Sequence, residues 1–229
     1  MVSRNISRLY ARCLISVMVG EGGFTRDTLI CYITAGFKEM RNYRYQGFQL
    51  TPILAIIGLN LVLFFITQFD RVAAYRLLGL TPALVITQPW TIITSMFMHA
   101  GFRHIFFNML ALYFFGTYLS GIIGDKKFLW VYFGGGILGG ILYTLLAPPF
   151  IPAIGASGAV FAIAGTLVVL NPRIRVLLFF ILPVPLWVAV ILGLLIISPG
   201  IAWEAHLGGL LFGLAAGYIF RREMRRRYW

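Results

Sequence analysis

One serine in an apolar part of the chain lies where a nucleophile for acyl transfer could work. Ser157 belongs to the segment Gly155-Ala156-Ser157-Gly158, near the start of an apolar run that extends to Leu170. The first turn of a helix offers unpaired backbone amides and a positive end that can stabilise an oxyanion, and flanking glycines leave space for a substrate backbone. A serine in a membrane helix more often only caps the helix or hydrogen-bonds locally. Ser157 therefore needs a partner before it indicates catalysis.

A histidine in a later apolar run could be that partner. His206 lies in the segment Ala205-His206-Leu207-Gly208-Gly209. An imidazole can accept a proton at neutral pH, which is what a serine hydroxyl lacks on its own. The alternative is a packing histidine that hydrogen-bonds a backbone carbonyl.

Small residues predict that the helices carrying this serine and this histidine approach closely. Glycines recur at four-residue spacing after the histidine, and a matching small face follows the serine. These residues are Gly209, Gly213 and Gly217 in the later run, and Gly158, Ala162 and Gly165 in the earlier one. Close approach of the two faces would bring the imidazole within reach of the hydroxyl.

A third apolar run contributes two side chains that can donate hydrogen bonds. His104 and Asn108 are four residues apart, so they project from one face of a helix. Such donors can hold a tetrahedral oxyanion, although Asn and His also commonly link membrane helices. His99, five residues earlier, is expected in the preceding loop, where it would fix the position of that loop.

No carboxylate is placed to extend the pair into a triad. Asp125 and Glu223 are predicted on the opposite side of the membrane, Asp70 lies in a loop, and Glu204 is two residues from His206 and points away from it. The simplest hypothesis is a serine–histidine dyad. Three histidines without an HExxH motif or an adjacent acidic ligand do not indicate zinc, so neither a metal nor a cofactor is expected.

The composition predicts that these residues lie within a membrane. Hydrophobic residues make up 60% of the 229, charged residues only 11%, and the mean hydropathy is +0.88, too apolar for a soluble domain. The net charge of +12 does not indicate nucleic-acid binding, because the basic residues fall at the ends of apolar runs, where they would meet anionic lipid. Cys13 and Cys31 both precede the first run, so no disulfide framework or metal site is indicated.

The apolar runs predict an all-α, six-transmembrane helical bundle. The expected spans are about 50–67, 101–123, 128–146, 156–170, 176–197 and 201–220, with Pro183 and Pro185 bending the fifth. With six spans, the basic N-terminus, Lys126-Lys127, Arg173 with Arg175 and the basic tail all share one side, which makes the topology N-in, C-in. The spans then bring the four candidate polar residues to a similar depth on the outer side.

Three parts of the chain are expected. Residues 1–48 form a basic extension on the cytoplasmic side, 49–220 the membrane domain, and 221–229 a basic cytoplasmic tail. The extension could be an amphipathic or partly disordered surface segment or a transit-like peptide, or translation could begin at Met40.

At this point the chain resembles the rhomboid family of intramembrane serine proteases, over roughly 50–220. Gly155 to Gly158 resembles the GxSG motif of that family, and Ala205 to Gly209 resembles its AHxxG motif. His99, His104 and Asn108 resemble its second-span pattern. Departures from the family pattern are Trp90-Thr91 in place of a Trp-Arg pair, Phe161 in place of a tyrosine, and Ser120 near the usual position of a glutamate.

The resemblance implies a fold and an activity. It implies a rhomboid-type bundle in the cell (plasma) membrane that cleaves transmembrane protein substrates near the outer membrane boundary. Ser157 would be the nucleophile and His206 its base, with His104, Asn108 and the Ser157 amide around the oxyanion. Gly155, Gly158, Gly209, His99 and the aromatic ring of Phe161 would support them. The alternatives are an inactive rhomboid-like protein that binds membrane clients and a transporter, although no charge relay or inverted repeat is evident.

Overall fold

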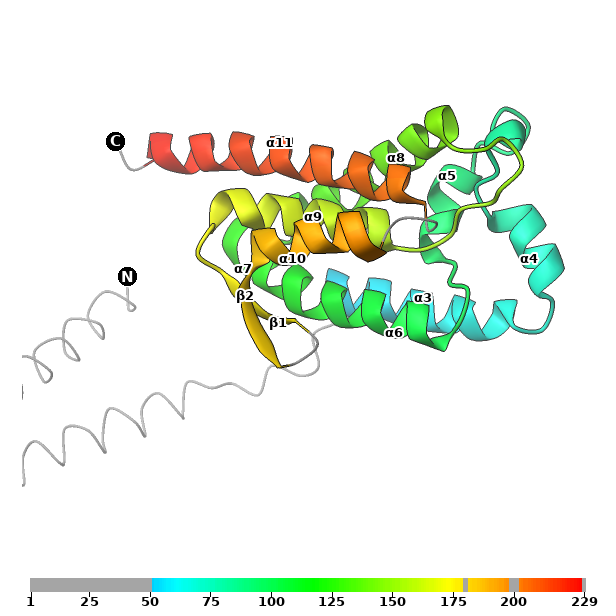
Figure 1. Cartoon of the computed structure of the whole chain (residues 1–229), viewed down its shortest axis with the longest axis horizontal. Helices are drawn as coiled ribbons and strands as arrows, with labels where there is room; N and C mark the ends of the chain where they lie inside the picture. The colour runs from blue at the N-terminus through cyan, green and yellow to red at the C-terminus, as the bar shows by residue number, and fades with distance from the viewer. Residues whose placement is uncertain (1–50, 179–180, 198–201, 228–229) are drawn as a thin grey trace, which may run out of the picture. The chain divides into compact units, whose positions relative to one another are not determined.

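Helices make up nearly all of the regular structure (Figure 1). The computed structural model describes residues 51–178, 181–197 and 202–227, which belong to one compact unit. The predicted basic extension 1–48 lies outside the described residues. The structure therefore does not address any of the interpretations given for it. The long helices are α3 (Pro52–Thr67), α6 (Phe102–Ala111) continued by η3 (Leu112–Gly116) and α7 (Thr117–Ile123), α8 (Asp125–Leu146), α9 (Ser157–Leu170) and α11 (Trp203–Arg227). The shorter elements are α4 (Arg71–Leu78), η1 (Pro82–Leu84), α5 (Thr91–Thr94), η2 (Ser95–Phe97), β1 (Arg175–Leu178), β2 (Leu182–Pro185), α10 (Leu186–Leu192) and η4 (Gly193–Ile197).

Two helices in the described part of the chain are long and apolar enough to cross a membrane, Phe102–Ile123 and Asp125–Leu146. Three further apolar helices, Pro52–Thr67, Ser157–Leu170 and Leu186–Leu195, are shorter. Many large apolar side chains point outwards, among them Phe65, Phe102 and Leu145. An apolar exterior of this kind suits contact with lipid rather than water. The helical membrane architecture agrees with the prediction. The count of six spans and the N-in, C-in orientation stay predictions.

Helix α9 lies at the centre of the described helices (Figure 1). It packs most extensively against α11 and α8, and it also contacts α10, α6 and α7. Ala162, Ile163 and Leu167 are completely buried. A helix that is apolar on all sides is stable only when other elements surround it, which agrees with the position of α9 in the core of the bundle.

Glycines bring the backbones of α9 and α11 into direct contact. A Cβ atom on Gly209 would lie 1.9 Å from the carbonyl oxygen of Gly158, and one on Gly213 would lie 2.0 Å from that of Ala162. The close approach predicted for these small faces is present. Gly165 also belongs to this contact, since a Cβ atom there would lie 3.0 Å from the Leu210 carbonyl oxygen and 3.3 Å from the Leu214 backbone nitrogen of α11.

The region predicted as the fifth span is corrected by the structure. Residues 176–178 and 182–185, expected to begin a bent helix, instead belong to two antiparallel strands in which Arg175 pairs with Pro185 and Val176 with Val184. Helix α10 starts only at Leu186. Proline lacks an amide hydrogen and disfavours helical geometry in the residue before it. Pro183 and Pro185 therefore delay the helix rather than bend it.

The last helix is longer than predicted. The sequence suggested an end near Phe220, followed by a tail, but α11 continues to Arg227. Arginine and glutamate are good helix formers, and an ion pair between Glu223 and Lys127 of α8 fixes this extension to the bundle. The Lys127 ammonium also lies 4.7 Å from the centre of the Phe220 ring.

We predict that Gly213→Ala destabilises the bundle, because its new methyl group meets the Ala162 carbonyl and forces α9 and α11 apart. The expected loss is about 1–3 kcal/mol of unfolding free energy, measured by denaturant titration of the full chain in mixed micelles. Gly58→Ala in α3 is the matched control, because nothing lies within 4 Å of a Cβ atom there. Equal stability of the two variants would contradict the close contact.

Candidate active site

The serine and histidine singled out in the sequence touch each other. Ser157 Oγ lies 2.7 Å from His206 Nε2, a hydrogen-bonding distance. Ser157 is the first residue of α9, and His206 lies in the first turn of α11. The hydroxyl can donate to the imidazole when Nε2 carries no proton. This arrangement can move a proton from serine to histidine as the oxygen attacks an electrophile.

An aromatic ring holds the imidazole in place. Phe161, one turn after Ser157, stacks on the His206 ring with centroids 4.7 Å apart and planes 18° from parallel. Gly193 lies behind Phe161, since a Cβ atom there would be 3.3 Å from the ring. His206 is buried. Its ring is therefore confined by packing on one face and by Ser157 at Nε2.

The loop that leads into Ser157 is fixed at two points. Ala153 and Leu80 exchange both backbone hydrogen bonds, at 2.8 and 3.0 Å. The Gly155 amide donates to the Ser95 carbonyl at 2.9 Å. Gly155 has a φ of +128°, a backbone conformation that only glycine adopts readily. These contacts determine where α9 begins and hence where the Ser157 hydroxyl points.

His104 lies beside this loop. A Cβ atom on Gly155 would be 2.8 Å from His104 Nε2 and 3.6 Å from Ser157 Oγ, so the imidazole and the hydroxyl flank the same glycine. The Ala100 amide donates to His104 Nδ1 at 3.3 Å. Because Nδ1 accepts, a neutral ring carries its proton on Nε2. His104 thus presents a donor on the side of the serine.

The Asn108 side chain is hydrogen-bonded within its own helix. Its side-chain amide donates to the His104 carbonyl of its own helix at 2.9 Å. One of its two amide hydrogens can be directed elsewhere while the other keeps this bond.

His99 lies in the loop between η2 and α6, outside the spanning helix Phe102–Ile123. Its ring is buried and meets the His104 ring edge to face, with centroids 4.9 Å apart. Burial, reinforced by the neighbouring His104, lowers the pKa of His99 to about 3. His99 is therefore neutral at pH 7, and its uncharged ring packs against the His104 ring.

Three of the four carboxylates considered from the sequence are engaged elsewhere. Asp70 caps α4 through the Ala73 amide, Asp125 accepts from Ser120, and Glu223 pairs with Lys127. Glu204 is buried in the first turn of α11.

Sequence reasoning missed Ser95, Leu80 and Gly193 as parts of the site. Ser95 and Leu80 act through their backbone atoms, which leave no trace in residue type. Gly193 acts by lacking a side chain beside Phe161.

The departure from the family pattern at Trp90-Thr91 affects the loop before η2. The Trp90 indole donates to the Leu77 carbonyl at 2.9 Å, and Thr91 donates to the Gln88 carbonyl at 2.6 Å, so both residues anchor the loop locally.

The described helices form a membrane bundle in which a serine and a histidine are in contact. Comparison with known proteins identifies the family. The model of the rhomboid domain matches residues 86–223. The chain belongs to the rhomboid family, whose members are integral membrane proteins.

Relatives occur in bacteria and in mitochondria. The chain is 30% identical over 207 residues to the putative rhomboid protease YdcA of Bacillus subtilis, covering 82% of this chain and 99% of that protein. It is 32% identical over 192 residues to Rhomboid protein 1, mitochondrial, of Saccharomyces cerevisiae, covering 76% of this chain and 55% of the yeast protein. With RHOMBOID-like protein 12, mitochondrial, of Arabidopsis thaliana it shares 34% identity over 146 residues, 52% of this chain and 43% of the plant protein. The chain thus spans about half the length of these two mitochondrial relatives.

We predict that Gly155→Ala destabilises the chain by about 1–3 kcal/mol, because alanine is strained at this positive φ and its methyl group collides with the His104 ring. Denaturant titration in micelles measures the loss. Gly101→Ala is the control, since Gly101 has an extended φ of −178° and open space around a Cβ atom. A Gly155→Ala variant as stable as Gly101→Ala would show that the loop tolerates a side chain next to His104.

Proposed function

We propose that this protein is an intramembrane serine endopeptidase that works through a dyad of Ser157 and His206. The observation that carries this proposal is the 2.7 Å contact between the hydroxyl of α9 and the imidazole of α11. The names of relatives support it, since they include rhomboid proteases. An inactive relative that only binds membrane clients has no need to keep both groups in contact.

The proposed reaction begins with attack of Ser157 Oγ on a peptide carbonyl, while His206 Nε2 takes the hydroxyl proton. The negative charge that develops on the carbonyl oxygen is stabilised by the backbone amide of Ser157, by the Nε2 proton of His104 and by the second amide hydrogen of Asn108. His206 then gives its proton to the leaving amine, and the peptide bond breaks. Water hydrolyses the resulting ester of Ser157, with His206 again acting as the base.

The proposed substrates are transmembrane proteins cleaved near the outer membrane boundary. Ser157 opens α9, while His104 and His206 lie in the first turns of α6 and α11. All three groups therefore belong to the same ends of three helices, at shallow depth. A site at this level suits a chain that leaves the hydrocarbon region, where its backbone loses helical hydrogen bonds more easily than at the midplane.

The division into a basic extension (1–48), a six-span domain (49–220) and a basic tail (221–229) is likewise proposed, with both termini in the cytoplasm and the protein in the cell (plasma) membrane. The basic residues at the C-terminal ends of α9 and α11 support the orientation. Two relatives, from Saccharomyces cerevisiae and Arabidopsis thaliana, are named as mitochondrial proteins.

We predict that Ser157→Ala abolishes both labelling by a fluorophosphonate probe and cleavage of a model transmembrane substrate, lowering turnover by at least about 1,000-fold, because the nucleophile is lost. The measurements are in-gel fluorescence and product formation with the full chain in micelles. Ser120→Ala is the control, since Ser120 bonds to Asp125 at the end of α7 and should leave both signals unchanged. Persistent labelling of Ser157→Ala would defeat the assignment of the nucleophile.

We predict that a fluorescent protein fused after Trp229 is fluorescent in bacterial cells, whereas alkaline phosphatase fused there is inactive, because a cytoplasmic C-terminus permits only the first. Fusions placed in the loop at Pro149 should give the opposite pattern. Active phosphatase at the C-terminus would reverse the proposed orientation without touching the proposed chemistry.

A further inference from the structure

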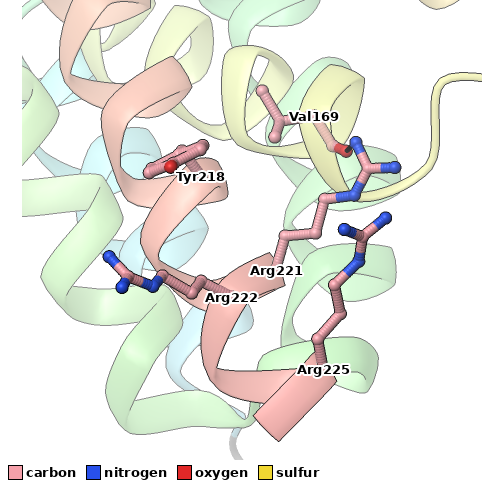
Figure 2. Close-up of a pocket in the computed structure, with 5 residues that line it drawn as sticks. All are labelled: Val169, Tyr218, Arg221, Arg222 and Arg225. Carbon is pink, nitrogen blue, oxygen red and sulfur yellow. Dashed lines mark hydrogen bonds between the residues drawn. The ribbon is translucent and has the colours of Figure 1, made fainter.

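A basic pocket lies at the ends of α9 and α11 that are opposite to Ser157 and His206. The cavity has a volume of about 520 Å³. It is lined by Val169 near the C-terminus of α9 and by Tyr218, Arg221, Arg222 and Arg225 on α11 (Figure 2). Neither the dyad nor its supporting residues reach this part of the fold, so the pocket requires its own explanation.

Positive charge in the pocket is not balanced by a carboxylate among the residues that line it. In Figure 2 the Arg221 and Arg225 side chains run towards the end of α9, whereas Arg222 lies on the side of α11 that carries Tyr218. Arg221 and Arg225 are four residues apart, so their charges repel each other on the helix surface. Glu223, which lies between them in sequence, is drawn to Lys127 of α8. An anion in the pocket would relieve this repulsion.

The groups around the pocket can bind more than a bare charge. Arg221 makes one long hydrogen bond of 3.5 Å to the Val169 carbonyl, which leaves its other guanidinium hydrogens available. A guanidinium offers paired donors that match phosphate oxygens, and a tyrosine hydroxyl offers another. The donors present are therefore suited to a phosphate group.

The surface of α11 beside the pocket is apolar. Leu211, Ala215 and Tyr218 are exposed, and their spacing of four and three residues places them in one stripe that leads to Arg222. Tyrosine is typical of the interface between hydrocarbon and water, and arginine near a helix end extends towards the headgroups. A ligand that joins a phosphate to hydrocarbon chains would satisfy both the arginines and this stripe.

We propose that the pocket binds the phosphate group of an anionic phospholipid, with an acyl chain along the Leu211, Ala215 and Tyr218 stripe. Arg221 and Arg225 hold the phosphate on one side and Arg222 approaches it from the other. The proposal rests on the membrane location that the family establishes. It does not depend on the proposed protease activity, so either can fail alone.

Native mass spectrometry of the full chain, released from micelles that contain equal amounts of phosphatidylglycerol and phosphatidylcholine, tests the proposal. The natural sequence should retain phosphatidylglycerol preferentially. Arg221→Gln and Arg225→Gln should each lower that preference about fivefold, as expected for one arginine near anionic lipid. The charge-matched control is Arg173→Gln, which also removes one charge, after α9, without altering the pocket lining.

Two outcomes would overturn the proposal. Equal loss of preference in the pocket variants and in the control would show diffuse attraction rather than a site. Displacement of the lipid by excess inorganic phosphate would show that the pocket takes a free phosphate and gains nothing from the acyl chains. If the Arg221 variant unfolds in a thermal scan, Arg225→Gln and Arg225→Lys provide the test, because Arg225 makes no hydrogen bond to another described residue. The lysine variant should retain more lipid than the glutamine variant, since it keeps the charge.

Discussion

The contact between the backbones of α9 and α11 is the constraint on which the site depends. Gly209 rests on the carbonyl of Gly158, and both residues lie within one turn of the reactive pair. A side chain at Gly209 would force the two helices apart, because its Cβ atom would lie 1.9 Å from the Gly158 carbonyl oxygen. The 2.7 Å separation of the Ser157 hydroxyl and the His206 imidazole thus depends on the absence of a side chain at Gly209. Close packing of this kind gives a nucleophile and its base a fixed geometry before substrate arrives.

Other parts of the fold complete this geometry from the remaining directions. Phe161 confines the imidazole from within α9, and Gly155 lets the entering loop bend around His104. The loop itself is tied to Leu80 and Ser95, which belong to the segment between the first two long helices. That segment consists of short helices and contributes no proposed catalytic group. Its function in the structure is to hold the start of α9 in place.

Much of the site could be predicted from the sequence, because residue types and their spacing determine which helix faces can meet and which side chains they bring together. Glycines at four-residue intervals after His206 mark a helix face that can approach another backbone, and small residues after Ser157 mark its counterpart. Contacts made through main-chain atoms, such as those of Ser95, could not be predicted, since any residue type can supply them.

The prediction of the fifth span was wrong for a different reason. Hydropathy alone does not distinguish an apolar hairpin from an apolar helix, and the two prolines at 183 and 185 decided between them. The helical continuation to Arg227 also escaped prediction, since an arginine-rich end is equally compatible with a loop.

The brevity of α9 has a consequence for the surrounding lipid. Its 14 residues rise about 21 Å, whereas the hydrocarbon layer of a bilayer is about 30 Å thick. If α9 begins to cross at the polar boundary near Asn171, it ends roughly 9 Å short of the other one. The shortfall is a hydrophobic mismatch. The bilayer cannot correct it by thinning locally, because α9 is surrounded by other helices rather than by lipid. Backbone that is not helical at this depth must be covered by protein or water, and the loop held by Leu80 and Ser95 occupies this end of α9. The Ser157 hydroxyl is therefore set below the membrane boundary by the length of its own helix.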